Sequence, residues 1–312
     1  MKKSFRLLLL SAFALTAFNA AAADDPTDAL PWSRIDHNPV TLGMGTAGFA
    51  DTDNAAWASF RNAALTPLTA GSFSAAASWA RWMPSSDDGA LNHINAGAAY
   101  RFGRMGVALG VSYMPGKEYE VFNLTGASEG KYTPKDLQLN AGFGYALTEA
   151  LSLGANVRYL SSSLTADDSY TSLAGDIAAV YNLGSATVAA GLSNIGTAIE
   201  DAAGNKYSIP TSVSLGSTWH AAFEGVHAVK ASLDADYFFS GELTAALGAQ
   251  YSYDNLVFVR AGYHVASEHA VLPSFLTLGL GVSYAGFSLD AAYITANEAL
   301  GNTLTLGLKY QF

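Results

Sequence analysis

Residues 302–312 read NTLTLGLKYQF and alternate between apolar and polar side chains without interruption. The apolar parity consists of Leu304, Leu306, Leu308, Tyr310 and Phe312, and small or polar residues fill the other parity. A period of two is the period of a β-strand, so one face of this strand is apolar and the other is polar. The stretch therefore predicts a terminal strand whose two faces meet different solvents.

The first 23 residues have the pattern of a secretory signal peptide. Lys2, Lys3 and Arg6 make a basic start, residues 7–18 are apolar, and a tract of small residues ends at Ala23. The apolar stretch is too short for a comfortable transmembrane helix. We expect cleavage near Ala23 and exclude residues 1–23 from the fold.

The composition is unusual for a soluble protein. Only 13% of the residues are charged, against about 25% in ordinary soluble domains, while 30 glycines and 12% aromatic residues are present. The chain has no cysteine, so an exported form must be held by packing or by a closed hydrogen-bond network. A net charge of −10 disfavours nucleic acid as a partner. Together these features indicate an outer-membrane β-barrel.

From residue 70 onward the sequence divides into fourteen alternating segments of roughly ten residues. We predict strands at 70–83, 92–102, 105–115, 135–147, 151–163, 171–183, 186–195, 210–221, 226–238, 243–253, 255–265, 274–285, 286–296 and 302–312. An even number lets the first and last strands pair antiparallel. The sequence thus predicts an all-β fold, a 14-stranded antiparallel transmembrane barrel over residues 70–312, located in the bacterial outer membrane.

Connection lengths and aromatic positions agree with this count. Connections after even-numbered segments are very short, whereas most of those after odd-numbered segments are longer, as at 84–91, 116–134, 196–209 and 266–273. Short periplasmic turns and longer extracellular loops are typical of such barrels. Tyr or Trp often ends the apolar face, which suits the membrane interface. We expect that face to meet lipid, and Tyr310 and Phe312 to close the last strand onto the first.

Residues 24–69 precede the strands and do not alternate. They mix Pro, Gly and Asn with apolar side chains such as Leu42, Met44, Phe49 and Trp57. A disordered periplasmic tail is one interpretation, but this apolar content favours an ordered plug inside the lumen.

The stretch 39–68 carries a recognisable set of residues. Three groups stand out along it: the turn Gly43, Met44 and Gly45, the middle residues Asp51, Asp53, Asn54 and Trp57, and the triplet Asn62, Ala63 and Ala64. This pattern resembles the N-terminal hatch of the FadL superfamily of barrels, closest in style to the PorV/PorQ branch of Bacteroidota. Ala63 stands where that branch has a proline. The resemblance implies fourteen strands and a hatch.

Charged residues also fall on the polar parity of the predicted strands: Arg101, Arg158, Asp176, Lys230, Asp234, Asp236, Arg260, Asp290 and Lys309. We interpret them as a self-neutralising lumen that holds the hatch by ion pairs, with a polar ligand path as the alternative. Because both signs are present, no ion selectivity is predicted.

Other candidate chemistry is weak. The stretch 51–54 (DTDN) lacks the glycine and distal glutamate of a calcium loop. The glycine-rich stretch 43–48 lacks the strand and helix of a nucleotide site. His264, Ser267, Glu268 and His269 cluster without a catalytic motif. We therefore expect a non-enzymatic chain without a metal or cofactor, and we expect its five tryptophans to serve packing and the membrane interface rather than ligand binding.

Two functions remain open. The resemblance implies a docking or scaffold subunit of an outer-membrane protein machine, either type IX secretion-like or for outer-membrane protein assembly. The alternative is a FadL-like channel for long-chain fatty acids or other hydrophobic molecules, which needs a greasy pocket beside the hatch. Expected partners are the lipid bilayer, lipopolysaccharide and, for the first function, other envelope proteins. If the wall opens sideways, one candidate place for the break in the ladder is around Met114, Pro115 and Gly116, because proline cannot donate to the ladder.

Overall fold

The computed structural model describes residues 28–86, 90–123, 125–165, 168–200, 204–268, 270–295, 297–298 and 300–312. The predicted signal peptide, residues 24–27 of the predicted hatch segment and His269 lie outside these ranges.

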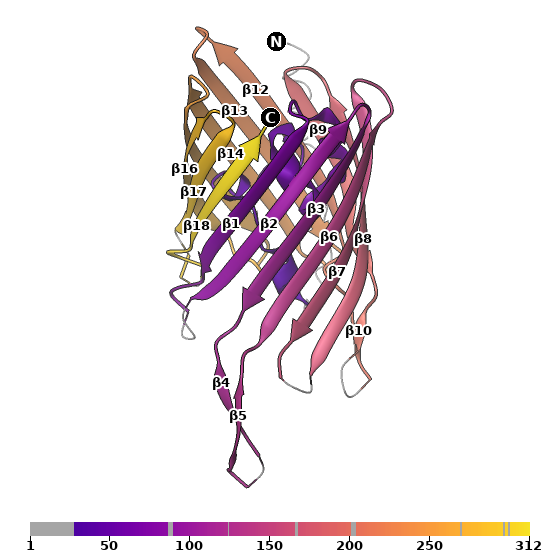
Figure 1. Cartoon of the computed structure of the whole chain (residues 1–312), viewed down its shortest axis with the longest axis vertical. Coiled ribbons are helices and arrows are strands. Elements are labelled where there is room, and N and C mark those ends of the chain that lie inside the picture. The colour runs from indigo at the N-terminus through magenta and orange to yellow at the C-terminus, as the bar shows by residue number, and fades with distance from the viewer. Residues whose placement is uncertain are drawn as a thin grey trace.

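Fourteen antiparallel strands close into one barrel, in the order β1-β18-β17-β16-β15-β14-β13-β12-β9-β8-β7-β6-β3-β2 (Figure 1). Their bounds are β1 Phe73–Trp82, β2 Leu91–Phe102, β3 Met105–Pro115, β6 Lys135–Ala146, β7 Leu151–Ser163, β8 Ser169–Asn182, β9 Ala186–Gly196, β12 Ser212–Phe223, β13 His227–Phe238, β14 Leu243–Tyr253, β15 Val257–Ala266, β16 Phe275–Tyr284, β17 Phe287–Thr295 and β18 Leu304–Gln311. The predicted 14-stranded barrel is confirmed by this closed strand order.

The last strand closes the sheet onto the first. Strand β18 pairs with β1 from Leu304 opposite Arg81 to Gln311 opposite Ser74. Beyond the ladder, the Phe312 carbonyl accepts hydrogen bonds from the backbone N–H of Ser72 at 2.7 Å and of Phe73 at 3.1 Å. These bonds extend the closure to the final residue.

The two faces of the wall differ as the alternation predicts. In β16, Leu276 and Leu278 point outward and are 39% and 51% exposed, whereas Thr277 between them is buried. Large apolar side chains are exposed on the outer surface of the described barrel strands other than β13, and only a hydrocarbon solvent makes such a surface stable. The barrel therefore spans a membrane. None of the described helices is long and apolar enough to do so.

Two small hairpins extend the longer connections. Strands β4 Tyr119–Phe122 and β5 Ser128–Tyr132 project well beyond the barrel (Figure 1), and β10 Ile199–Glu200 pairs with β11 Lys206–Tyr207. They were not predicted, because such short strands have no sustained apolar parity. The end of the barrel that carries them is the extracellular end, since long loops lie on that side.

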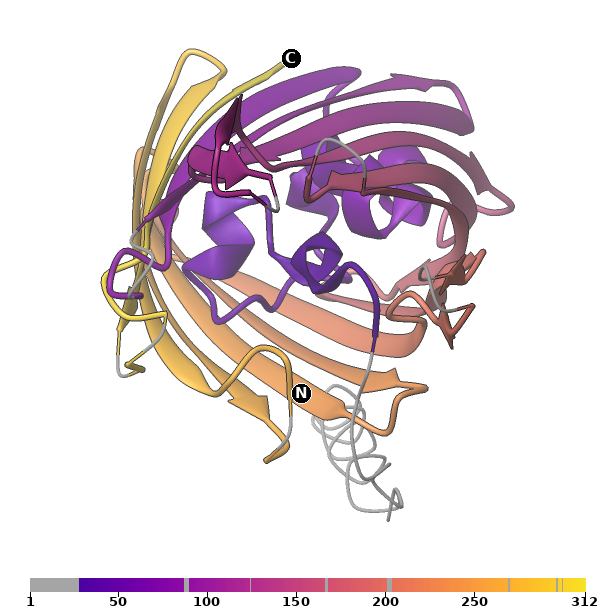
Figure 2. The same ribbon diagram turned by 90° about the horizontal axis from the view of Figure 1, so that it is seen from below.

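Residues 28–69, called the hatch from here on, lie inside the barrel in both views (Figures 1 and 2). They form five short helical pieces: η1 Pro31–Arg34, α2 Pro39–Leu42, η2 Thr52–Trp57, α3 Ala58–Arg61 and η3 Ala63–Leu68. Capping side chains explain where three of them begin. Asn38, Asp51 and Asn62 each accept a hydrogen bond from the backbone N–H two residues later.

Glycines in the wall let the hatch backbone approach closely. A Cβ added to Gly262 of β15 would lie 2.0 Å from the carbonyl carbon of Met44, and one added to Gly248 of β14 would lie 2.4 Å from the Met44 oxygen. Gly45 has a φ of 71° and would place a Cβ 2.5 Å from the Tyr263 nitrogen. The hatch turn thus rests on a strip of wall that has no side chains.

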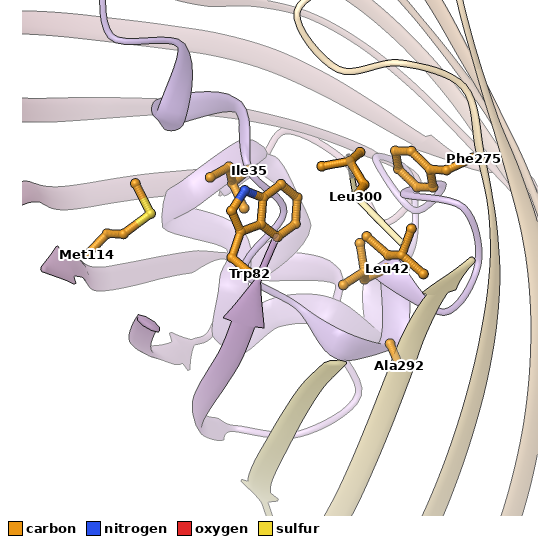
Figure 3. Close-up of a cluster of buried hydrophobic side chains, with 8 residues drawn as sticks. Ile35, Leu42, Trp82, Met114, Phe275, Ala292 and Leu300 are labelled. Atoms are coloured by element: carbon orange, nitrogen blue, oxygen red, sulfur yellow. The ribbon is translucent and has the colours of Figure 1, made fainter. Parts of the chain in front are cut away.

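Apolar clusters pack across the extracellular end of the lumen. In one of them Ile35 and Leu42 of the hatch meet wall and loop residues, among them Trp82, Phe275 and Leu300 (Figure 3). A second cluster joins Leu30 to Leu160, Ala174, Ile199 and Ile209. Residues 30–35 therefore form a cap over the interior.

Candidate functional site: a cavity between hatch and wall

An ion-pair group ties the hatch to β13. The Lys230 ammonium lies 2.9 Å from Asp51 Oδ2 and 2.5 Å from Asp53 Oδ2. The positive charge of Lys230 lowers the pKa of Asp53 to about 2. Lys309 adds a weaker contact, with its Nζ 3.5 Å from the Asp53 carbonyl. The stretch 51–54 therefore contacts two lysines of the wall. Among the described residues, no three or more potential metal ligands lie close enough together to bind a metal ion.

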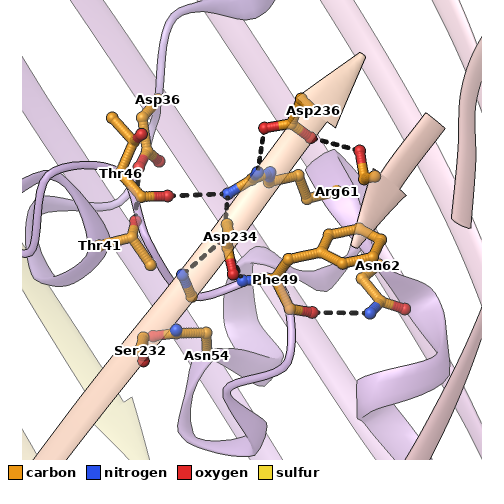
Figure 4. A network of polar contacts seen from close by, with 12 residues as sticks. Asp36, Thr41, Thr46, Phe49, Asn54, Arg61, Asn62, Ser232, Asp234 and Asp236 are labelled. Carbon is orange, nitrogen blue, oxygen red and sulfur yellow. Dashed lines mark hydrogen bonds and ion pairs between the residues drawn. The ribbon is translucent and has the colours of Figure 1, made fainter. Parts of the chain in front are cut away.

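Arg61 makes the second link between hatch and wall (Figure 4). Its guanidinium donates to the Thr46 carbonyl at 2.9 Å, to Asp234 Oδ2 at 3.4 Å and to Asp236 Oδ2 at 3.3 Å. Asp234 Oδ2 also accepts the backbone N–H groups of Gly48 and Phe49, both at 2.8 Å. One buried carboxylate thus orders a whole turn of the hatch.

The remaining predicted lumen charges pair within the wall or contact hatch backbone. Arg158 lies 2.7 Å from Asp176 and also donates to the Phe60 carbonyl. Arg260 lies 2.7 Å from Asp290. Arg101 donates to the Ala70 carbonyl at 3.3 Å, near the periplasmic end. These contacts agree with the interpretation of a self-neutralising lumen.

Some residues of the hatch motif rest on the barrel wall, and others line a cavity. Gly43, Met44 and Gly45 form the turn on β14–β16, and the Gly45 N–H donates to Thr277 Oγ1 at 2.9 Å. Asn54 and Trp57 line a cavity that is described below.

The triplet that follows packs against the wall. Asn62 donates to the Phe49 carbonyl at 2.8 Å. Ala63 and Ala64 rest on Gly142, Gly144 and Gly154, where an added Cβ would lie 2.2 Å from the Ala64 nitrogen in the closest case. Alanine therefore fills the place of the expected proline without loss of packing.

Between hatch and wall lies a cavity of about 130 Å³. Its apolar lining includes Phe49, Trp57 and Phe60 of the hatch, together with Phe238 of β13. Its polar lining comes from the hatch and from six wall strands, and consists mainly of Asp36, His37, Arg61, Arg158, Asn194, Ser214, Asp236 and His264. The lining is therefore mixed: apolar surface is the larger part, and polar side chains make up the rest. Trp57 lines this cavity and also packs in a buried cluster with Ala56, Phe60 and Ala76.

A buried ion pair holds the cap above this cavity. Arg34 of η1 and Glu242, which precedes β14, make two hydrogen bonds, and the Arg34 guanidinium stacks 3.6 Å from the centre of the Phe238 ring. The backbone N–H of Val271 also donates to Glu242 Oε2 at 3.3 Å. Sequence reasoning missed Arg34, Asp36, Arg61 and Glu242. The available signal was that each is an isolated charge in a chain that has few.

The predicted extracellular cluster does not assemble as a catalytic group among the described residues. His264 faces the lumen, where its Nδ1 lies 3.0 Å from Thr46 Oγ1 and its ring stacks on Phe275. Ser267 instead accepts a hydrogen bond from the backbone N–H of Leu243.

The wall near Pro115 is paired on one side. Pro115 lies opposite Lys135 of β6, so the β3–β6 ladder continues through it, whereas the β2–β3 ladder ends at Ile94 opposite Tyr113. Within the described barrel, the recorded register shift lies elsewhere, between Gly175 and Ile177 of β8. At this candidate place the ladder between β3 and β6 is therefore unbroken, and on the β2 side the proline lies beyond the end of the ladder.

Comparison with known proteins gives a fold. No family model matches the chain, and no curated protein matches its sequence. Among solved structures, it is similar to the toluene transporter TbuX of Ralstonia pickettii, with a TM-score of 0.60 at 14% identity over 88% of this chain and 98% of that one. It is also similar to the CymD monoaromatic hydrocarbon channel, with a TM-score of 0.61 at 16% identity over 88% and 97%. A Pseudomonas aeruginosa FadL homologue gives 0.53 at 12% over 88% and 98%.

The chain therefore has the fold of FadL-type outer-membrane barrels, as the sequence resemblance implied. With its apolar outer surface, it is a protein of the bacterial outer membrane and contacts the lipid bilayer. The narrower assignment to the PorV/PorQ branch has no support in these similarities.

Proposed function

We propose that this chain is an outer-membrane channel for small hydrophobic or amphipathic molecules, and that the cavity between hatch and wall is a binding station on their path. The observation that carries the proposal is the cavity itself, which a FadL-type barrel encloses and whose mainly apolar lining includes four aromatic rings, Phe49, Trp57, Phe60 and Phe238. Two structures of similar fold are those of a toluene transporter and a monoaromatic hydrocarbon channel, which supports the same substrate class.

The size of the cavity limits what it can hold. Its volume of about 130 Å³ is close to the roughly 150 Å³ of an engineered protein cavity that binds benzene. A molecule with one aromatic ring fits, whereas a long acyl chain needs the hatch to move. The cavity thus favours one-ring compounds over long-chain fatty acids.

Cavity filling tests this proposal. Ser193 of β9 lines the cavity, so Ser193→Phe should occupy it, while Ser193→Ala keeps it open. We would measure uptake of radiolabelled toluene and benzyl alcohol by cells that express either variant, with equal amounts of folded barrel in the outer membrane. Uptake should fall several-fold with phenylalanine and stay near wild type with alanine. Equal uptake by both variants, or by cells without the barrel, would contradict the proposal.

A docking role is the second candidate, because of the hairpin β4–β5. This hairpin projects into the extracellular space (Figure 1) and exposes Tyr119 and Phe122 at its base and turn. Exposed aromatic residues on a projecting element suit contact with another protein. Deletion of residues 119–132 separates the two functions: it should leave uptake unchanged for a channel, and should release co-purifying envelope proteins for a docking subunit.

A further inference from the structure

Counted together with the ion-pair partners of its arginines, the polar lining of the cavity has an excess of carboxylates. Arg34 pairs with Glu242, and Arg158 with Asp176, so these two cations are neutralised. Arg61 is then the remaining cation of the lining, and it faces Asp234 and Asp236. A third carboxylate, Asp36, also lines the cavity and lies on the other side of Arg61 (Figure 4).

These groups remain accessible although they lie deep in the barrel. The Arg61 side chain is 34% accessible and that of Asp236 is 18% accessible, and Asp36 is likewise only partly covered. All three line the cavity, so their accessible surface faces the space that a ligand would fill. They are therefore available to a bound molecule without loss of the hatch contacts.

The negative charge of Asp36 is not fully compensated by its surroundings. Its Oδ2 accepts from Thr41 Oγ1 at 2.6 Å and its Oδ1 from the Asn38 N–H at 3.0 Å. Even so, burial raises the pKa of Asp36, against the opposing effect of the Arg61 charge. His37 does not supply the missing cation, because burial lowers its pKa well below the usual 6.5.

Unpartnered polar atoms point to a ligand. Asn194 is 6% exposed and lines the cavity, and its Oδ1 has no hydrogen-bond partner among the described residues, although its Nδ2 donates to the Pro210 carbonyl. Nε2 of His37 and of His264 is also unpartnered at the cavity, judged by the same described residues. A buried acceptor without a donor is costly, so a donating molecule would complete Asn194 Oδ1. A neutral histidine nitrogen can also accept such a hydrogen bond. The unpartnered Arg34 Nε and Asn54 Nδ2 of the same lining are donors.

The aromatic side of the cavity suits a cationic or hydrogen-bond-donating head group as well. Phe49 and Phe60 flank the polar residues, and Arg61 already lies 5.5 Å from the centre of the Phe49 ring. Ring faces attract cations within about 6 Å. An ammonium head beside the carboxylates would gain this attraction, whereas a carboxylate head would be repelled by both surfaces.

We infer that the cavity selects molecules with a one-ring apolar body and a cationic or hydrogen-bond-donating head, such as a small aromatic amine, and rejects the corresponding carboxylates. Asp36 and Asp236 bind the head, and the hatch aromatic residues bind the ring. The inference rests on the proposed channel function and narrows its substrate class.

Three ligands that share a ring and one carbon test it: benzylamine, benzyl alcohol and benzoate. Their binding to the purified full-length barrel in detergent would be measured by calorimetry, with Ser193→Phe as the blank for partition into micelles. We expect benzylamine to bind about tenfold more tightly than benzyl alcohol, because charge-assisted hydrogen bonds are the stronger kind, and benzoate to bind most weakly.

Variants locate the effect. Asp36→Asn and Asp236→Asn should each weaken benzylamine roughly tenfold and change benzyl alcohol less than about threefold. Glu120→Gln, which removes a distant exposed charge in β4, should change neither. If a variant does not fold, the ranking of the three ligands by the wild-type protein still decides.

The outcomes separate the two proposals. Benzoate binding as tightly as benzylamine, or equal affinity for all three ligands, overturns the head-group inference and leaves the channel standing. A wild-type barrel that binds none of the three and also fails to take up toluene overturns both.

Discussion

Arg34 and Glu242 join the cap to the wall through a buried ion pair in which Arg34 Nη1 lies 2.6 Å from Glu242 Oε2. Their side chains are only 5% and 1% accessible. The pair sits at the extracellular side of the cavity, which Arg34 also lines. Any molecule that arrives from outside through the lumen must displace this contact or pass around it.

Loss of this pair should loosen the cap. Glu242→Gln keeps the shape but leaves the Arg34 charge buried and unpaired, and breaking a buried pair typically costs about 3–5 kcal/mol. We expect faster hydrogen exchange at residues 29–35 and faster uptake of one-ring compounds. Exchange measured by mass spectrometry would show it.

Glu118→Gln is the matched control, because its pair with Lys131 is exposed and should contribute little. Unchanged exchange at residues 29–35 in Glu242→Gln would mean that apolar packing alone holds the cap.

Gly262→Ala should disturb the hatch more than the barrel. The new Cβ would lie 2.0 Å from the Met44 carbonyl carbon, which is part of a backbone that cannot rotate away. Overpacking of this kind costs roughly 1–3 kcal/mol. We expect a lower melting temperature and protease cleavage within the hatch.

Gly175→Ala is its control, since the nearest atom there lies at an ordinary 3.5 Å. If both variants have the melting temperature of the wild type, the close contact between Gly262 and Met44 is disproved.

Lys230→Met should change how stability depends on pH. In the wild type Lys230 holds the pKa of Asp53 at about 2, below the usual 3.9 of an unfolded chain. The stabilisation is therefore fully present above about pH 4 and is lost as the pH falls from 4 through 2. We expect the melting temperatures of wild type and Lys230→Met to differ at pH 7 and to converge as the pH approaches 2.

Lys131→Met, which changes an exposed loop charge, supplies the baseline for this series. A difference that stays constant from pH 7 to pH 2 would rule out the linkage.

Removal of Phe312 should weaken closure of the barrel. The deletion removes the carbonyl that accepts from Ser72 and Phe73, and a ring that lies 5.4 Å from that of Phe73. We expect less folded protein in the outer membrane, seen as a loss of the heat-modifiable band on gels.

Phe122→Ala in β4 removes an exposed ring far from the seam and should leave that band intact. Equal amounts of folded protein in both variants would show that Phe312 is dispensable for closure.

The strands were predictable because their signal is local. Leu276 to Val282 alternates with Thr277 to Gly281 whatever the rest of the chain does, and the same alternation recurs in each barrel strand. The short hairpins β4–β5 and β10–β11 lack that alternation, so the sequence indicated only loops. The lumen charges were predictable for the same reason, because each falls on the polar parity of its strand.

The sequence by itself therefore determined the barrel, its strand number, the lipid-facing surface and the side of the wall on which Lys230 and Asp234 lie, since a period of two fixes which face each residue takes. Only the tertiary structure decided that Lys230 meets Asp51, that Arg61 meets Asp234, and that a cavity remains between them and Phe238. The hatch has no regular period, and its contacts join residues more than 170 positions apart. Such contacts depend on how the folded segment fits the closed wall, which local pattern does not encode.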